Sequence, residues 1–173
     1  LELLQKSPRG QAVLREVASM AGWGQARPAG RALGIAFSDT WNSFIGMVTE
    51  VSIVQGRPVV HKIWAAVDCG HALTPRNVQT QIEGSAIYGL SAALGEKLTY
   101  KGGVAQEKNL GAYNLLRAAE TPVVDVKVMP TDNYPGGIGE VGLPPVAPAI
   151  ANAIARLNGK RIRTLPFPAN VNA

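Results

Sequence analysis

Glu140 is the side chain of this sequence with the clearest setting for chemistry. It lies in the run PGGIGEVGLPP at positions 135–145, among glycines and prolines, with no lysine or arginine within several residues to pair with it. Glycine allows backbone conformations closed to other residues and lets another group come close. A lone acid on such a loop, ahead of a helix begun by proline, could be aimed into a pocket, where its chemistry would be proton transfer. A solvated loop glutamate would have the same sequence features.

Three glycines of the same run, Gly137, Gly139 and Gly142, match the dinucleotide-binding pattern G-x-G-x-x-G. That fingerprint requires a strand directly before the glycines, a helix opened by them, and an acid about 20 residues further on. Here a loop at 130–135 precedes the glycines, the helix begins after the third glycine, and no Asp or Glu follows Glu140. The sequence therefore argues against a nicotinamide dinucleotide site.

The composition indicates one globular domain. The chain has 173 residues, of which 46% are hydrophobic and 17% charged, which is enough to bury a core and unlike a disordered chain. No apolar run approaches the roughly 18 residues needed to span a bilayer, so no membrane span is expected in this segment.

The net charge of +5 is concentrated in an acid-free tail that contains Arg156, Lys160, Arg161 and Arg163. A basic tail can bind nucleic acid. Aromatic residues make up only 6% of the chain, however, and the cluster lies at the expected C-terminus of a helix, where cations favour the helix dipole. We therefore expect a solvated helix end or a protein interface, and no nucleic acid.

Few side chains of this sequence could ligate a metal. Cys69 is the only cysteine, and His61 and His71 are the only histidines. One thiol cannot hold an iron–sulfur cluster, a structural zinc or an internal disulfide. Cys69 ends an apolar run and is interpreted as a small buried side chain, and both histidines are interpreted as structural. We predict no metal bound by protein side chains.

The remaining pattern predicts an α+β fold with mainly antiparallel strands and about three principal helices. A first helix or helix pair, broken near Ser7 and Pro8, is predicted to end at about 22–24. Thr74 and Pro75 are typical of the N-cap and first residue of a second helix. A third is predicted to run from about Pro145 to Leu157 and to stop at 158–159. Strands are predicted at 33–37, 44–54, 59–67 and 123–129, with hairpin turns at 55–58 and 101–103.

Three segments occur in this order at suitable separations: VDCGHALTPRNVQTQIEGSAIYGLSAAL, LRAAETPVVDVKVMP and PGGIGEVGLPPVAPAIANAIARLNGKRIRTLPF. Together they resemble the catalytic subunit of the molybdenum hydroxylases, the family of xanthine oxidase and aldehyde oxidase. The opening segments SPRGQAVLREVASMAGWG and GIAFSDTWNSFIGMVTEVSI are similar to its isoquinoline 1-oxidoreductase beta-subunit subfamily. The resemblance implies that residues 1–173 are a single C-terminal fragment of a much longer subunit, within its molybdopterin-binding domain.

The same resemblance implies cofactors, partners and a reaction. The complete subunit would bind molybdopterin cytosine dinucleotide, with molybdenum held by the pterin and not by a protein side chain. A separate small iron–sulfur subunit would carry two 2Fe–2S clusters, which fits the scarcity of cysteine in this chain. The substrate would be an isoquinoline-like N-heterocycle or an aldehyde, hydroxylated with oxygen from water.

The resemblance also implies roles for individual residues. Glu140 matches the glutamate of the family's G-x-G-E segment, which implies that it is the general base and that it is buried beside the cofactor. Gln81, in QIEG, matches a glutamine that lies against the cofactor, although a glutamine on the helix surface is the alternative. Backbone amides around the molybdenum end are expected from four residues: Gly136, Gly137, Ile138 and Gly139.

A second interpretation treats the chain as a stand-alone interaction module that retains the fold without its chemistry. That module would begin near Leu1 and behave as a stable monomer. The first interpretation expects the remaining cofactor segments and the rest of the catalytic subunit upstream, so that this fragment alone would fold but be inactive. Only the first explains PGGIGE and QIEG together.

Overall fold

Four strands form the central sheet of the computed structural model, which describes residues 1–172. An antiparallel meander is formed by β1 (Arg31–Thr40), β2 (Ser43–Val54) and β3 (Arg57–Asp68). The last strand, β6 (Val123–Val128), pairs in parallel with β3, so the order is β1-β2-β3-β6. The predicted α+β class with mainly antiparallel strands is confirmed.

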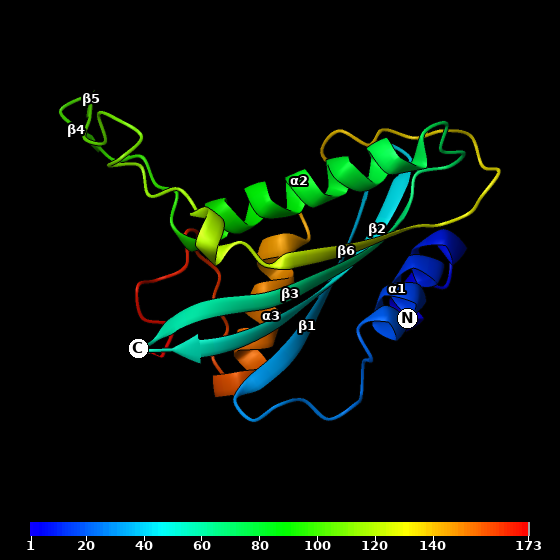
Figure 1. The fold of residues 1–173 in the computed structure, drawn as a ribbon, viewed down its shortest axis with the longest axis horizontal. Coiled ribbons are helices and arrows are strands. Elements are labelled where there is room, and N and C mark those ends of the chain that lie inside the picture. The colour runs from blue at the N-terminus through cyan, green and yellow to red at the C-terminus, as the bar shows by residue number, and fades with distance from the viewer. Residues whose placement is uncertain (173) are drawn as a thin grey trace.

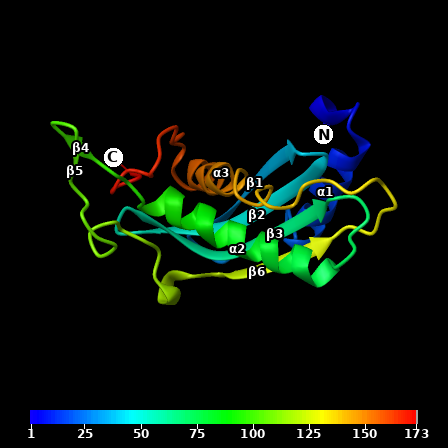
Figure 2. The same cartoon turned by 90° about the horizontal axis from the view of Figure 1, so that it is seen from above.

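Three helices cover the two faces of this sheet, as the two perpendicular views in Figures 1 and 2 show. One face is covered by α1 (Pro8–Met20) and the other by α2 (Pro75–Leu94) and α3 (Val146–Asn158). The larger core lies between the sheet and the pair α2 and α3, and a smaller core lies under α1. The prediction of three principal helices is confirmed.

Two glycines of the sheet allow these helices to approach closely. A Cβ atom added to Gly46 of β2 would lie 2.9 Å from the Val13 carbonyl oxygen of α1. A Cβ atom added to Gly34 of β1 would lie only 1.9 Å from the Ala149 carbonyl oxygen and 2.3 Å from the Ala153 nitrogen of α3. Any larger side chain at Gly34 would therefore displace α3 from the sheet.

The start of α2 and the end of α3 lie within one residue of the predicted positions, and α1 has a cap that was not predicted. The Ser7 hydroxyl accepts a hydrogen bond from the Gly10 amide at the start of α1, and Gly159 ends α3 in the left-handed region with φ of 76°. Thr74 occupies the N-cap of α2, but its side chain makes no capping bond. At that end Pro75 begins the helix in the expected way.

The edge strand β1 is covered along part of its length by side chains of α3. The Asn152 side-chain amide donates to the Ile35 carbonyl at 2.9 Å, and the Arg156 guanidinium donates to the Leu33 carbonyl at 3.3 Å. Arg156 also lies over the Trp23 ring at 4.6 Å. Arg156, one of the cations of the basic tail, thus makes contacts within the fold.

A short hairpin stands away from the body of the molecule in Figure 1. It consists of β4 (Tyr100–Lys101) and β5 (Val104–Ala105), which confirms the predicted turn at 101–103. The Glu107 carboxylate binds the Thr99 hydroxyl at 2.8 Å and closes the base of the hairpin. Two short 3-10 helices, η1 (Glu2–Leu4) and η2 (Ala118–Glu120), complete the fold. Within residues 1–172, no helix is both long enough and apolar enough to cross a membrane.

Candidate active site

Glu140 lies in the connection between β6 and α3, which runs past the end of the sheet at the beginning of α2 (Figure 2). It lines a hollow of about 490 Å³ whose walls include Gly84, Tyr88 and Leu143. The side chain is exposed in residues 1–172, so these residues alone do not bury Glu140, and its burial beside the cofactor in the complete subunit stays a prediction. The reason is geometric: its loop forms one wall of the hollow, and nothing in the described chain lies over the opposite side.

The glycine loop before Glu140 is fastened to the end of the sheet by backbone hydrogen bonds. The Gly136 amide donates to the Cys69 carbonyl and the Gly137 amide to the Trp41 carbonyl, both at 2.8 Å. The Ser43 hydroxyl donates to the Gly137 carbonyl at 2.6 Å. The amides of Gly136 and Gly137 are therefore engaged within the chain, and the predicted donation of these two amides to a cofactor is not available in this conformation.

Gln81 connects α2 to the same loop. Its side-chain amide donates to the Gly139 carbonyl at 2.7 Å. It lines the hollow of Glu140 and also a neighbouring hollow whose wall includes Ile138, Gly136 and Cys69. The structure thus brings Gln81 together with the predicted site residues of the loop, although 58 residues separate Gln81 from Gly139 in the sequence.

The surface around Gln81 has room and hydrogen-bonding groups for a flat polar cofactor. Cβ atoms added to Gly84 or Gly139 would meet no other atom within 4 Å. The amides of Ile138, Gly139 and Glu140 donate to no acceptor in the part of the chain that the structure describes. These features fit the edge of a pterin, which carries both donors and acceptors. They do not depend on the amides of the first two glycines.

Side chains that could ligate a metal do not gather here. Among the described residues, no three His, Cys, Asp or Glu side chains are grouped so that they could hold a metal ion. Cys69 is buried, as predicted, and burial raises the pKa of its thiol. A metal at this site would have to be held by its cofactor.

An ion pair between α1 and the end of β3 was not identified from the sequence. The Arg9 guanidinium donates from Nε to Asp68 Oδ2 at 2.8 Å and from Nη2 to Asp68 Oδ1 at 2.7 Å. Asp68 is only 5% exposed. Burial alone would raise its pKa, but hydrogen bonds from Arg9 and from the Gly70 amide hold the pKa of Asp68 below its ordinary value. An acid that ends an apolar strand requires such a partner, and this was the available signal.

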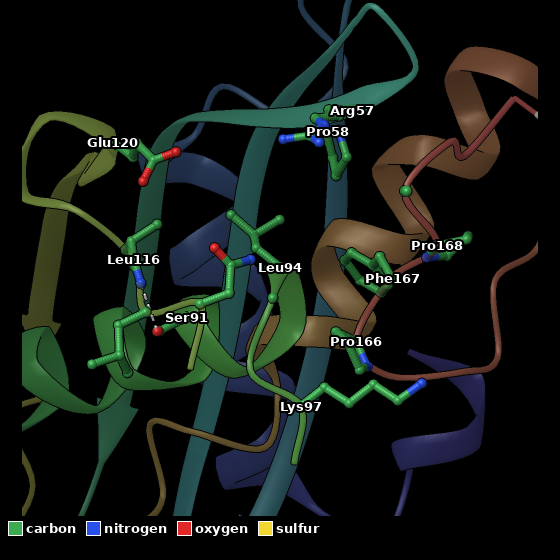
Figure 3. A pocket seen from close by; sticks show the side chains of 14 residues that line it. Arg57, Pro58, Ser91, Leu94, Lys97, Leu116, Glu120, Pro166, Phe167 and Pro168 are labelled. Carbon is green, nitrogen blue, oxygen red and sulfur yellow. Dashed lines mark hydrogen bonds between the residues drawn. The ribbon is translucent and has the colours of Figure 1, made fainter. Parts of the chain in front are cut away.

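A separate hollow lies at the far end of α2 (Figure 3). It has a volume of about 320 Å³ and lies between Leu94, Phe167 and Leu116, with Arg57 and Lys97 at its rim. None of the predicted site residues lines it. The predicted chemistry is therefore confined to the opposite end of α2.

Comparisons with known proteins identify one family. The model of the molybdopterin cofactor-binding domain matches residues 18–122. The chain is 39% identical over 170 residues to isoquinoline 1-oxidoreductase subunit beta of Brevundimonas diminuta, covering 95% of this chain and 22% of that protein. It is 34% identical over 172 residues to the membrane-bound aldehyde dehydrogenase (pyrroloquinoline-quinone) of Gluconacetobacter polyoxogenes, covering 94% of this chain and 22% of that protein. The chain thus spans about a fifth of the length of these curated relatives.

Solved structures show the same fold. CO dehydrogenase from Oligotropha carboxidovorans superposes with a TM-score of 0.62 and 22% identity, over 70% of this chain and 17% of that one. Quinoline 2-oxidoreductase from Pseudomonas putida 86 superposes with a TM-score of 0.59 and 22% identity, over 65% of this chain and 15% of that one.

Proposed function

The chain belongs to the family of molybdopterin cofactor-binding domains, and from this premise we propose that it is part of a molybdenum hydroxylase of isoquinoline 1-oxidoreductase type. Relatives carry the names of oxidoreductases of an N-heterocycle and of aldehydes. The observation that carries the proposal is the meeting of Glu140, Gln81 and the glycine loop around one open surface.

Glu140 is the general base in this proposal. Hydroxylation of an electron-poor carbon with oxygen from water requires that the attacking oxygen lose a proton, and a carboxylate within reach can accept it. No Lys, Arg or His among residues 1–172 forms a salt bridge with Glu140. Its oxygens therefore remain available as proton acceptors. The bound cofactor would supply the two-electron oxidation of the carbon.

Gln81 and the loop amides would hold the cofactor. Gln81 Nε2 already donates to the Gly139 carbonyl. The side-chain oxygen of Gln81, Oε1, is therefore the atom left to accept a hydrogen bond from a pterin edge. The unpaired amides of Ile138 and Gly139 would donate on the other side. Gly136 and Gly137 would act by holding the loop against the sheet.

The complete enzyme contains more than this chain in the proposal. The cofactor is the molybdopterin cytosine dinucleotide form, and the 2Fe–2S clusters are carried by a small partner subunit. The rest of the catalytic subunit would cover the open side of the hollow and thereby bury Glu140. By this reasoning residues 1–173 alone are inactive, and the substrate is an N-heterocycle or an aldehyde.

Replacing Glu140 by glutamine in the complete enzyme tests the assignment. We expect turnover to fall by at least about 10²-fold, since the amide cannot accept the proton, while molybdenum and CMP contents stay unchanged. Glu83→Gln is the matched control, because Glu83 lies on α2 outside the hollow of Glu140 and accepts a hydrogen bond from Gln79 at 3.0 Å.

Near-normal turnover of the Glu140→Gln enzyme would refute the role of Glu140. Absence of both molybdenum and CMP from the wild-type subunit, produced in a host that makes the cofactor, would favour the interaction module instead.

A further inference from the structure

The loop that carries Glu140 rests on two separate supports at one end of the sheet. The first support follows β3: the Cys69 carbonyl accepts from the Gly136 amide, and the His71 amide donates to the Asn133 carbonyl, both at 2.8 Å. The second support is the β1–β2 turn, where the Trp41 carbonyl accepts from the Gly137 amide at 2.8 Å. The position of Glu140 therefore depends on how these two supports are placed relative to each other.

One side chain contacts both supports. Arg9 binds the carboxylate of Asp68, which directly precedes Cys69, through two hydrogen bonds of 2.8 and 2.7 Å. A third nitrogen of the same guanidinium, Nη1, donates to Asn42 Oδ1 in the β1–β2 turn at 3.2 Å. The guanidinium also lies over the Phe44 ring at 4.4 Å, which holds its plane. Arg9 thus joins the two supports through one rigid group.

Asp68 is connected to the loop through Gly70. Its Oδ1 atom accepts a hydrogen bond from the Gly70 amide at 3.0 Å. Gly70 has φ of 73°, and a Cβ atom added there would lie 2.2 Å from the Tyr134 carbonyl oxygen. The loop passes so close to Gly70 that no empty space lies between them. A shift of Asp68 would therefore move Gly70 and, with it, the loop.

We propose that Arg9 and Asp68 form a positioning pair. The pair holds the Glu140 loop so that the carboxylate lies within reach of the oxygen it deprotonates, an inference that rests on the proposed role of Glu140 as the base. Neither side chain lines the hollow of Glu140, so the pair acts through the loop. The planar guanidinium is suited to this role because it makes several hydrogen bonds in a fixed geometry, which the point charge of lysine does not.

The sheet provides a matched control. Arg31 donates to the carboxylate of Glu50 at 2.9 Å, and Glu50 is 7% exposed, close to the 5% of Asp68. This second pair joins the start of β1 to β2 at the Glu50 position, distant in register from the β1–β2 turn. Arg27 also lies 3.6 Å from the Glu50 carboxylate, so Arg31→Gln removes one of two cationic partners of a buried acid without moving the Glu140 loop.

The experiment compares Arg9→Gln, Arg9→Lys and Arg31→Gln in the complete, cofactor-loaded enzyme. A displacement of about 1 Å can lower a rate about 10²-fold. We therefore expect Arg9→Gln to lower kcat by roughly 10- to 100-fold, with KM and molybdenum content little changed. Arg9→Lys should recover only part of the loss, and Arg31→Gln should keep kcat within about two-fold of the wild type.

Hydrogen exchange supplies a readout that does not depend on turnover. The Gly136 and Gly137 amides should exchange faster in Arg9→Gln, because their acceptors on the two supports have moved apart. They should exchange at the wild-type rate in Arg31→Gln. If Arg9→Gln does not yield folded enzyme, Arg9→Lys, which keeps the charge, carries the same comparison.

Unchanged kcat or unchanged exchange of these two amides in the Arg9 variants would overturn the positioning role. Turnover lost in Glu140→Gln but retained in Arg9→Gln would overturn the positioning pair alone. Turnover retained in Glu140→Gln would overturn the base, and with it the inference about Arg9.

Discussion

Replacing Gly34 by alanine should push α3 away from the sheet. The added methyl carbon would lie 1.9 Å from the Ala149 carbonyl oxygen and 2.3 Å from the Ala153 nitrogen, and Cβ contacts under 3.0 Å are essentially never seen. The helix must therefore retreat by more than 1 Å. Both contacts are backbone atoms, so no side-chain rotation can relieve them. Because α3 begins six residues after Glu140, the retreat also moves the proposed base.

The expected destabilisation follows from two opposing effects. Overpacking of a well-packed core costs about 1–3 kcal/mol, and the upper part of this range applies because the clash is with backbone. Alanine in a strand recovers roughly 0.5–1 kcal/mol relative to glycine. The net loss is about 2 kcal/mol, which corresponds to roughly a 30-fold increase in local opening of α3.

Amide hydrogen exchange of α3 in the complete subunit measures this opening. We expect roughly 30-fold faster exchange of the α3 amides in Gly34→Ala, together with reduced turnover. Gly84→Ala is the control for α3 exchange alone, because Gly84 lines the hollow of Glu140; a Cβ atom there meets nothing within 4 Å and alanine favours a helix by up to about 1 kcal/mol. Exchange of α3 as slow in Gly34→Ala as in the wild type would refute the reasoning about close packing.

Two further predictions concern the cofactor and the pH dependence of stability. Gln81→Ala removes the 2.7 Å hydrogen bond to the Gly139 carbonyl. It should weaken cofactor binding by about 1 kcal/mol, or roughly five-fold. Unchanged molybdenum per subunit, measured by mass spectrometry, would contradict this. Burial, together with the charge of Arg31, lowers the pKa of His61, so the folded protein favours the neutral imidazole. This contribution to stability is complete above the unfolded pKa of about 6.5 and is lost as the pH falls through the folded pKa. His61→Gln should therefore flatten the decline of the denaturation midpoint between about pH 7 and pH 5, and an equally steep decline in the variant would count against it.

Local backbone chemistry accounts for the parts of the fold that sequence patterns predicted. Pro75 begins α2, Gly159 ends α3 with φ of 76°, and the turn Gln55–Gly56 has φ of 51° and 78°. At such positions the residue type limits the conformations open to the chain. The predicted ends of these helices and of the β2–β3 hairpin were therefore close to those of the structure.

Contacts between distant segments account for what the patterns did not show. Arg9 and Asp68 are 59 residues apart, and neither position has a local signature that names the other. A strand was predicted at 123–129, close to the observed β6, but its parallel pairing with β3 depends on the path of α2 across the sheet. The exposure of Glu140 likewise depends on which segments cover the loop, and glycine content says nothing about that.

The side chains of Asn152 and Arg156 also determine in which direction the sheet can grow. They occupy the Ile35 and Leu33 carbonyls of β1, so a new strand cannot pair there without displacing α3. Within residues 1–172, β6 pairs with β3 alone, and its first residue, Val123, is 65% exposed. Unpaired strand edges are the places where a sheet accepts another strand. Any segment that extends this sheet would therefore add at β6, the edge strand on the side away from α3.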